Sequence, residues 1–231
     1  MTFEARRPPL RPKLMSFDVF GTLISVRDSS YGAFERILKA ASADRIDVKA
    51  FWEHWEHQNI QHYWDRPYQS YRDICRRSLA ETFRHFNVEG DSGLIGYYFD
   101  AFPGFFLYDD VARTLDILAR RYKLAVVSNI DDDLLAQTPL RRNFDLVCTA
   151  QRAQGYKPDG TLFRYLIDNA GVAKDEIFHS GQSQFTDLVG GKPLGLTIAW
   201  INRRAISLDD TVPRPDFILP DIQSLSGVVE F

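Results

Sequence analysis

Short apolar runs alternate with segments of helical periodicity along most of this 231-residue chain. The first run begins at Leu14 and ends at Asp18, just before a turn at Gly21. This alternation is typical of an α/β fold with a parallel, doubly wound sheet and right-handed crossovers. Further strands are predicted at 123–128, 146–149, 176–180, 196–201 and 216–219, with helices between them at 111–122, 134–140, 161–170 and 188–194.

The stretch from residue 26 to 101 interrupts this alternation, because it contains helical patterns and no convincing buried strand. Helices are predicted at 29–43 and 71–86, with an aromatic-rich segment at 51–64 between them. We therefore expect residues 26–101 to form a helical cap above the carboxyl end of the first strand. The core would then comprise residues 14–25 and 102–231, preceded by a flexible arm at 1–13 that lacks the apolar segment of a signal peptide.

Composition narrows the classes of function. A hydrophobic fraction of 45% with 26% charged residues is typical of a globular protein. The net charge of −3 gives no general attraction to nucleic acid or to anionic membranes, and no apolar run is long enough to span a bilayer. The only cysteines, Cys75 and Cys148, have no spacing typical of a zinc site or a disulfide framework. We expect a cytoplasmic protein with no nucleic-acid or membrane partner.

Polar side chains follow four of the predicted strands. Because the carboxyl ends of parallel strands meet at one edge of a sheet, these side chains are expected to lie close together and form a site. The alternative is a buried Lys157–Asp187 ion pair that merely fixes two loops. The polar strand ends are Asp18 with Thr22, Ser128 with Asn129, Lys157, and the loop from Gly181 to Asp187.

Taken in order, these segments resemble the four motifs of the haloacid dehalogenase superfamily, and Trp200–Arg203 resembles its 2-haloacid dehalogenase branch. The resemblance implies a Rossmann-like parallel core, a helical cap inserted after the first strand, and Asp18 as the nucleophile. It also suggests a homodimer formed through the cap. The four motifs are Phe17–Leu23, Val127–Asn129, Tyr156–Pro158 and Gly181–Asp187.

Two departures from the superfamily's phosphatases disfavour phosphoryl transfer. Those enzymes carry a second Asp two residues after the nucleophile, where this chain has Phe20. They also hold Mg²⁺ with a carboxylate directly after the fourth-motif glycine, where this chain has Gln182. A halide leaves carbon without being protonated, so Asp18 could displace it and form an ester that water hydrolyses. We therefore expect neither a metal nor a cofactor.

The resemblance implies roles for the other polar residues. Lys157 would keep Asp18 ionised, and Asp187 would hold Lys157 or help to activate water. The dehalogenases have a cap arginine just after a tryptophan, but Glu56 follows Trp55 here, so Arg66 or Arg72 would have to replace it. Thr22, Ser128 and Asn129 are expected to orient the carboxylate or the substrate, and Phe20, Trp55, Arg66, Tyr156 and Gln184 to contact the substrate.

The favoured hypothesis is thus a metal-independent hydrolase that displaces a leaving group, a halide, from carbon of a small 2-substituted carboxylic acid. Three alternatives stay open. They are hydrolytic opening of a strained ring such as an epoxide by the same Asp18 attack, a magnesium-dependent small-molecule phosphatase, and a binding protein that kept the fold without turnover.

Overall fold

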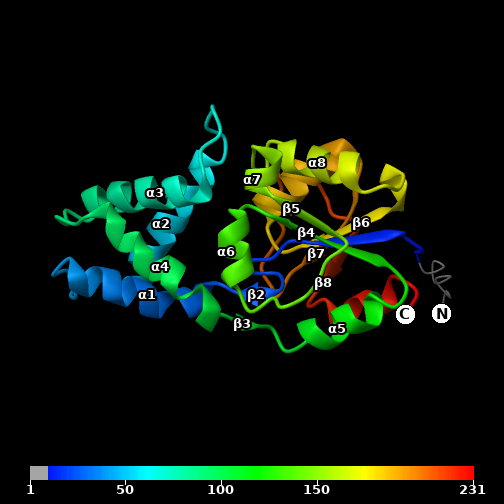
Figure 1. Ribbon diagram of the computed structural model, residues 1–231, viewed down its shortest axis with the longest axis horizontal. Helices are drawn as coiled ribbons and strands as arrows, with labels where there is room; N and C mark the ends of the chain where they lie inside the picture. Colours follow the sequence, from blue (N-terminus) through cyan, green and yellow to red (C-terminus); the bar gives the residue numbers. More distant parts are fainter. Residues whose placement is uncertain (1–9) are drawn as a thin grey trace.

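A six-stranded parallel sheet forms the centre of the computed structural model, which describes residues 10–231 (Figure 1). The strand order is β5-β4-β1-β6-β7-β8, so the predicted α/β class with a parallel sheet is confirmed. The strands are β1 (Leu14–Phe17), β4 (Lys123–Ser128), β5 (Leu146–Thr149), β6 (Ile177–Gly181), β7 (Thr197–Ile201) and β8 (Phe217–Leu219).

Strand β1 lies in the middle of the sheet and marks the point where the chain changes direction. From β1 the chain adds β4 and β5 on one side, and then β6, β7 and β8 on the other. In register, Phe17 at the end of β1 pairs with Val126 of β4 and Ser180 of β6. In open α/β sheets, ligands bind outside the carboxyl ends of the strands at such a switch point, which here is followed directly by Asp18.

Helices cover both faces of the sheet, which explains why the strands read as continuous apolar runs. On one face, Phe17 packs in a cluster with Leu115 of α5. On the other, Val127 packs in a cluster with Phe163 of α8. The core helices are α5 (Val111–Leu118), α6 (Asp132–Gln137), α7 (Ala150–Ala153), α8 (Thr161–Asn169) and α9 (Val189–Gly191), with 3₁₀ turns at Phe102–Gly104, Lys174–Glu176, Lys192–Leu194 and Gln223–Gly227.

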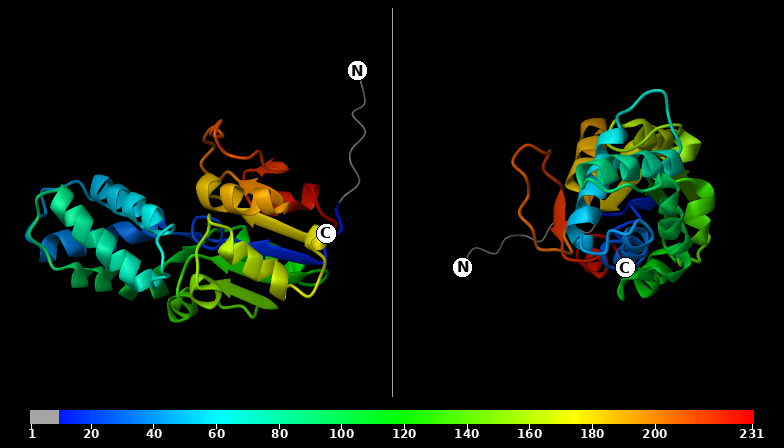
Figure 2. Two further views of the ribbon diagram at one scale, coloured as in Figure 1. Left: turned by 90° about the horizontal axis from the view of Figure 1, so that it is seen from above. Right: turned by 90° about the vertical axis from the view of Figure 1, so that its left-hand side faces the viewer.

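Four helices gather at one end of the molecule, to one side of the sheet (Figure 2). They fall within the predicted cap range of 26–101, although the division into two domains stays a prediction. A two-stranded antiparallel pair, β2 (Ile24–Ser25) with β3 (Phe106–Leu107), joins the segments that enter and leave this helical stretch. The helices are α1 (Arg27–Ala40), α2 (Val48–His62), α3 (Tyr71–His85) and α4 (Gly96–Asp100), with a 3₁₀ turn at Ser92–Ile95.

The helix predicted at 188–194 differs from the structure. The helical segment begins earlier, as a π-helical turn at Gln184–Leu188, followed by α9 and the 3₁₀ turn at Lys192–Leu194. The reason is a cap that the periodicity does not reveal: the Ser183 Oγ accepts a hydrogen bond from the Thr186 N–H at 3.1 Å. This early start places Asp187 within the turn, facing the sheet edge.

Residues 1–9 of the predicted flexible arm lie outside the described residues. The remaining four, 10–13, are part of the folded core, because Leu10 pairs with Val229 and the Lys13 N–H donates to the Glu176 carbonyl at 2.9 Å. Within residues 10–231, none of the helices combines the length and apolar composition that crossing a bilayer requires.

Phe34 of α1 is at the centre of the packing among the four helices, where its ring contacts Phe51, Trp55 and Tyr98. Phe34→Ala is expected to lower the free energy of unfolding by about 3–5 kcal/mol, because it leaves a cavity in a fully buried cluster. Phe106→Ala, at a ring that is 51% exposed, is the control and should cost less than about 1 kcal/mol. Urea unfolding measures both, and equal losses would contradict this assignment.

Candidate active site

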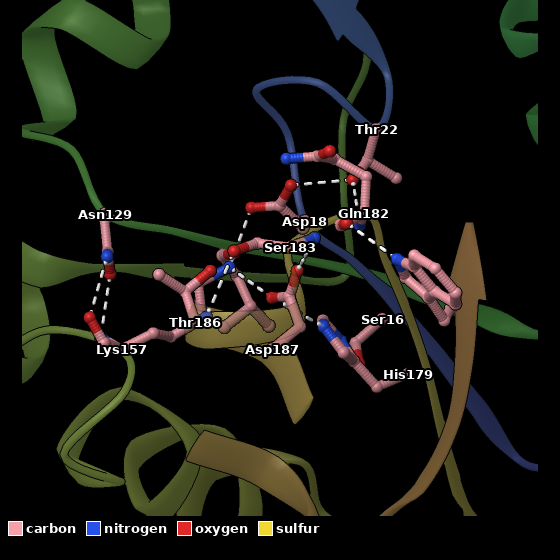
Figure 3. Close-up of polar contacts among 12 residues, drawn as sticks. Ser16, Asp18, Thr22, Asn129, Lys157, His179, Gln182, Ser183, Thr186 and Asp187 are labelled. Atoms are coloured by element: carbon pink, nitrogen blue, oxygen red, sulfur yellow. Dashed lines mark hydrogen bonds and ion pairs between the residues drawn. The ribbon is translucent and has the colours of Figure 1, made fainter. Parts of the chain in front are cut away.

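The carboxylate of Asp18 lies at the carboxyl end of β1, held by one hydrogen bond to each of its oxygens (Figure 3). The Thr22 hydroxyl donates to Oδ2 and the Lys157 Nζ donates to Oδ1, both at 2.7 Å. Thr22 comes back to Asp18 because the chain turns at Gly21, whose φ is +82°. A Cβ at Gly21 would also come within 2.8 Å of the Gln182 side chain. The turn therefore requires glycine.

Lys157 is the buried cation of the site. Its Nζ donates to Asp18 Oδ1 and Asp187 Oδ1 at 2.7 Å each, and to the Val127 carbonyl at 3.0 Å. All three ammonium hydrogens are therefore used within the protein. Asn129 fixes the backbone of Lys157, since its Oδ1 accepts from the Lys157 N–H at 2.8 Å and its Nδ2 donates to the Lys157 carbonyl at 2.9 Å. Asn129 thus positions the lysine.

Asp187 is the second carboxylate that bonds the Lys157 ammonium, and it is fully buried. Its Oδ1 also accepts from His179 Nε2 at 3.3 Å, and its Oδ2 accepts from the Ser183 N–H at 3.0 Å. His179 Nδ1 in turn lies 2.9 Å from the Ser16 hydroxyl. A continuous hydrogen-bonded chain therefore runs from Ser16 of β1 through His179 of β6, Asp187 and Lys157 to Asp18. The motifs carry no signal for the roles of Ser16 and Ser183, because Ser16 acts through a tertiary contact with His179 and Ser183 through its backbone N–H.

Asp18 and Asp187 share one ammonium group, but their pKa values are shifted in opposite directions. Burial alone would raise the pKa of Asp187, but the charge of Lys157 and the hydrogen bond from His179 lower it to about 2. The pKa of Asp18 is raised, because burial outweighs the effect of the Lys157 charge. The negative charge of Asp187 raises it further. Burial also opposes the charge on Lys157, but the two carboxylates raise its pKa above the ordinary value. Asp18 is therefore the carboxylate that takes up a proton first.

A cavity of about 130 Å³ lies beside Asp18, between the sheet edge and helix α2. Phe20 and Trp55, two of the predicted substrate contacts, line it. Ser128 lines it as well, and its buried Oγ has no hydrogen-bond partner within residues 10–231. A wider cavity of about 410 Å³ adjoins it and reaches the loop that carries Arg203. The inner cavity is large enough for a small organic acid.

Three predicted substrate contacts lie outside the inner cavity. Tyr156 is buried and donates its hydroxyl to the Gln69 carbonyl at 2.8 Å. Gln184 lines only the wider cavity, and its amide bonds the backbone of Ser207 and Asp209. Arg66 forms an ion pair with Asp159, and the alternative Arg72 pairs with Asp133 at 2.5 Å. These side chains therefore bond other protein groups and do not line the inner cavity.

The side chains at the sheet edge do not fit Mg²⁺, which prefers several charged oxygen ligands. Phe20 and Gln182 occupy the two positions where the superfamily's phosphatases have carboxylates. The facing oxygens of Asp18 and Asp187 are both bonded to the Lys157 ammonium. In the part of the chain that the structure describes, no group of three or more His, Cys, Asp or Glu side chains is arranged to hold a metal ion.

Comparison with known proteins agrees with the resemblance seen in the motifs. The model of the haloacid dehalogenase-like hydrolase family matches residues 12–195. The (S)-2-haloacid dehalogenase of Pseudomonas sp. strain YL is 25% identical over 227 residues, which is 94% of this chain and 93% of that protein.

Solved structures agree on the fold. The L-2-haloacid dehalogenase of Xanthobacter autotrophicus has a TM-score of 0.80 at 24% identity, covering 93% of this chain and 96% of that one. The magnesium-bound hydrolase YfnB of Bacillus subtilis also has a TM-score of 0.80, at 16% identity over 96% and 100% of the two chains. At these identities, the two likenesses show the fold alone.

The opposite pKa directions of the two carboxylates predict opposite effects of removing their charges at pH 7. The ionised form of Asp187 stabilises the folded state above pH 3.8, and this contribution is lost as the pH falls towards 2. Asp187→Asn should therefore lower the free energy of unfolding by roughly 2 kcal/mol, the equivalent of a pKa lowered from 3.8 to about 2.

For Asp18 the sign reverses, because a raised pKa means that its ionised form costs folding stability at neutral pH. Asp18→Asn should leave the stability unchanged or raise it. Urea unfolding of the two variants at pH 7 is the measurement. A larger loss for Asp18→Asn than for Asp187→Asn would contradict the assignment of the two pKa directions.

Proposed function

Because this chain belongs to the haloacid dehalogenase-like hydrolases, we propose that it hydrolyses a small 2-substituted carboxylic acid by attack of Asp18 on carbon, with halide as the leaving group. The observation that carries this proposal is the Asp18 carboxylate itself. It borders a small cavity, is held by Thr22 and Lys157, and lacks the carboxylate partners that a magnesium phosphatase needs. The name of the Pseudomonas relative supports the same chemistry.

In the first step, an Asp18 oxygen bonds to the substituted carbon, and the carbon–halogen bond breaks with its electron pair going to the halide. In the second, water attacks the acyl carbon of Asp18, and the ester bond breaks between that carbon and the ester oxygen. The departing alkoxide takes one proton of the water, and the other proton is released to solvent. The product is a 2-hydroxy acid, and one oxygen of the restored carboxylate comes from water.

Lys157 serves both steps without giving up its proton. Its charge favours the ionised form of Asp18 before attack, and its hydrogen bond to Oδ1 stabilises the negative charge that develops as water adds to the ester. Asp187 fixes the ammonium and keeps it charged. The Ser128 hydroxyl lies in the cavity without a hydrogen-bond partner among residues 10–231, and it would bond the carboxylate of the substrate. The cytoplasmic location and the homodimer stay predictions.

Turnover of 2-chloropropanoate in oxygen-18 water should place the label in the Asp18 peptide, because the ester is cleaved at the Asp18 carbonyl. Mass spectrometry of that peptide and the release of lactate are the two readouts. The rate should be unchanged by EDTA, and Asp18→Asn should show neither product nor label. The rate should also fall with decreasing pH at a value above 3.8, because attack needs the ionised form of a carboxyl whose pKa is raised.

Label found only in the product would contradict covalent attack by Asp18. Hydrolysis of phosphate esters that requires added Mg²⁺ would instead favour the phosphatase alternative. Failure to form an Asp18 ester with any of a broad set of halo acids and epoxy acids would favour a binding protein without turnover.

A further inference from the structure

Helix α2 brings a second carboxyl group, that of Glu56, to the cavity beside Asp18. The two groups come from different parts of the fold, Asp18 from the sheet edge and Glu56 from the helical stretch 27–100. Glu56 also lines the wider adjoining cavity, so it lies where the two cavities meet. Neither Arg66 nor Arg72 lines the inner cavity, and the cap arginine expected of a dehalogenase is therefore not replaced by either of them.

The surroundings of Glu56 favour its protonated form. Trp52 and Ile60 line the cavity next to it, and within residues 10–231 its carboxyl has neither a hydrogen bond nor an ion pair. Burial raises the pKa of Glu56, and the charge of Glu53 adds to this. Arg27 of α1 and Arg204 of the loop after β7 act in the opposite direction without reversing it.

Two further polar atoms on this face of α2 lack a partner. Trp52 and Asn59 are 1% and 2% exposed, and the Nε1 of the first and the Oδ1 of the second have no hydrogen-bond partner within residues 10–231. Both residues line the inner cavity. Positions 52, 56 and 59 share one helix face by their spacing. Because a buried polar atom without a partner costs about 1–3 kcal/mol, this face fits a ligand that carries a polar group on the cap side.

Resting on the proposed attack of Asp18 at carbon, we propose a second activity of the same site: Glu56 donates a proton to the ring oxygen of a small 2,3-epoxy acid as that oxygen leaves carbon. A halide is a stable anion and leaves unprotonated, whereas an alkoxide leaves slowly unless an acid protonates it. A carboxyl that has a raised pKa and lines the same small cavity as Asp18 is suited to the second task and unnecessary for the first. Glu56 is thus a catalytic residue that the motifs of the core do not contain.

An Asp18 oxygen bonds to a ring carbon, the carbon–oxygen bond of the ring breaks, and its electron pair takes the proton of Glu56 to give a hydroxyl group. Water then attacks the Asp18 acyl carbon and the ester breaks. The departing alkoxide takes one proton of the water, and the other returns to the Glu56 carboxylate through solvent. The product is a dihydroxy acid.

The test compares wild type, Glu56→Gln and Glu53→Gln with two substrates, glycidate and 2-chloropropanoate, in oxygen-18 water from pH 5 to 9. Glu53 is the matched control because it lies on the same helix, exposed, and lines neither cavity. Glu56→Gln should lower the ratio of kcat/KM for glycidate to that for 2-chloropropanoate about 100-fold, because the amide has no proton to give. It should also abolish the fall in glycidate turnover at alkaline pH. Glu53→Gln keeps the proton donor, so the ratio should change less than about 3-fold, while the alkaline fall moves to lower pH because the charge of Glu53 no longer raises the pKa of Glu56.

Three outcomes would overturn the inference. If both substrates lose activity equally in Glu56→Gln, the residue has only a structural or binding role. If wild type labels Asp18 with 2-chloropropanoate but does not open glycidate, the inference fails while the proposed function stands. If neither substrate labels Asp18 in wild type, the proposed attack at carbon fails, and the role of Glu56 fails with it.

Discussion

The site depends on one ammonium group shared by two buried carboxylates. Lys157 bonds Asp18 and Asp187 at equal distances of 2.7 Å, so its single positive charge cannot fully offset both negative charges. Asp187 has the additional hydrogen bonds from His179 and Ser183, which leaves Asp18 as the carboxylate with the less stabilised charge. This imbalance suits the nucleophilic role that we propose for Asp18, because a carboxylate whose charge is too well stabilised attacks poorly. The fold supplies the imbalance through the π-helical turn that carries Asp187.

A second set of contacts fixes the helical stretch 27–100 above this site. The carboxylate of Asp131, in the loop after β4, accepts hydrogen bonds at 3.0 Å from the first two N–H groups of α3, those of Tyr71 and Arg72. Tyr156, next to Lys157 in the chain, donates to the Gln69 carbonyl just before the same helix. The residues that flank the catalytic loops therefore also hold the helices that close the cavity. The position of the helical stretch 27–100 and the position of the Asp18 carboxylate therefore depend on the same two loops, those of Asp131 and Lys157.

These contacts show why the sequence predicted the sheet edge better than the cap. Strands 123–128 and 146–149 follow from local apolar runs, and Asp18, Lys157 and Asp187 follow from their places after strands. The negative charge of residues 131–133 indicates that they cap a helix. The sequence carries no signal that the helix capped by Asp131 is α3, which is 60 residues away in the chain. Tyr156 was assigned to the substrate for the same reason: its partner, the Gln69 carbonyl, carries no signal in the sequence.

In the two proposed reactions, the core positions Asp18 for attack and helix α2 contacts the leaving group. The same site could therefore act on substrates with different leaving groups. In both proposed reactions, the core residues around Asp18 serve attack at carbon with either leaving group, since Lys157 and Thr22 bond the Asp18 carboxylate. The leaving group must face the other side of the cavity, which α2 provides through Trp52, Glu56 and Asn59. A cation there would favour an anion such as halide, and a neutral carboxyl favours an atom that needs a proton. The choice of leaving group therefore lies in the face of α2, which no motif of the core determines.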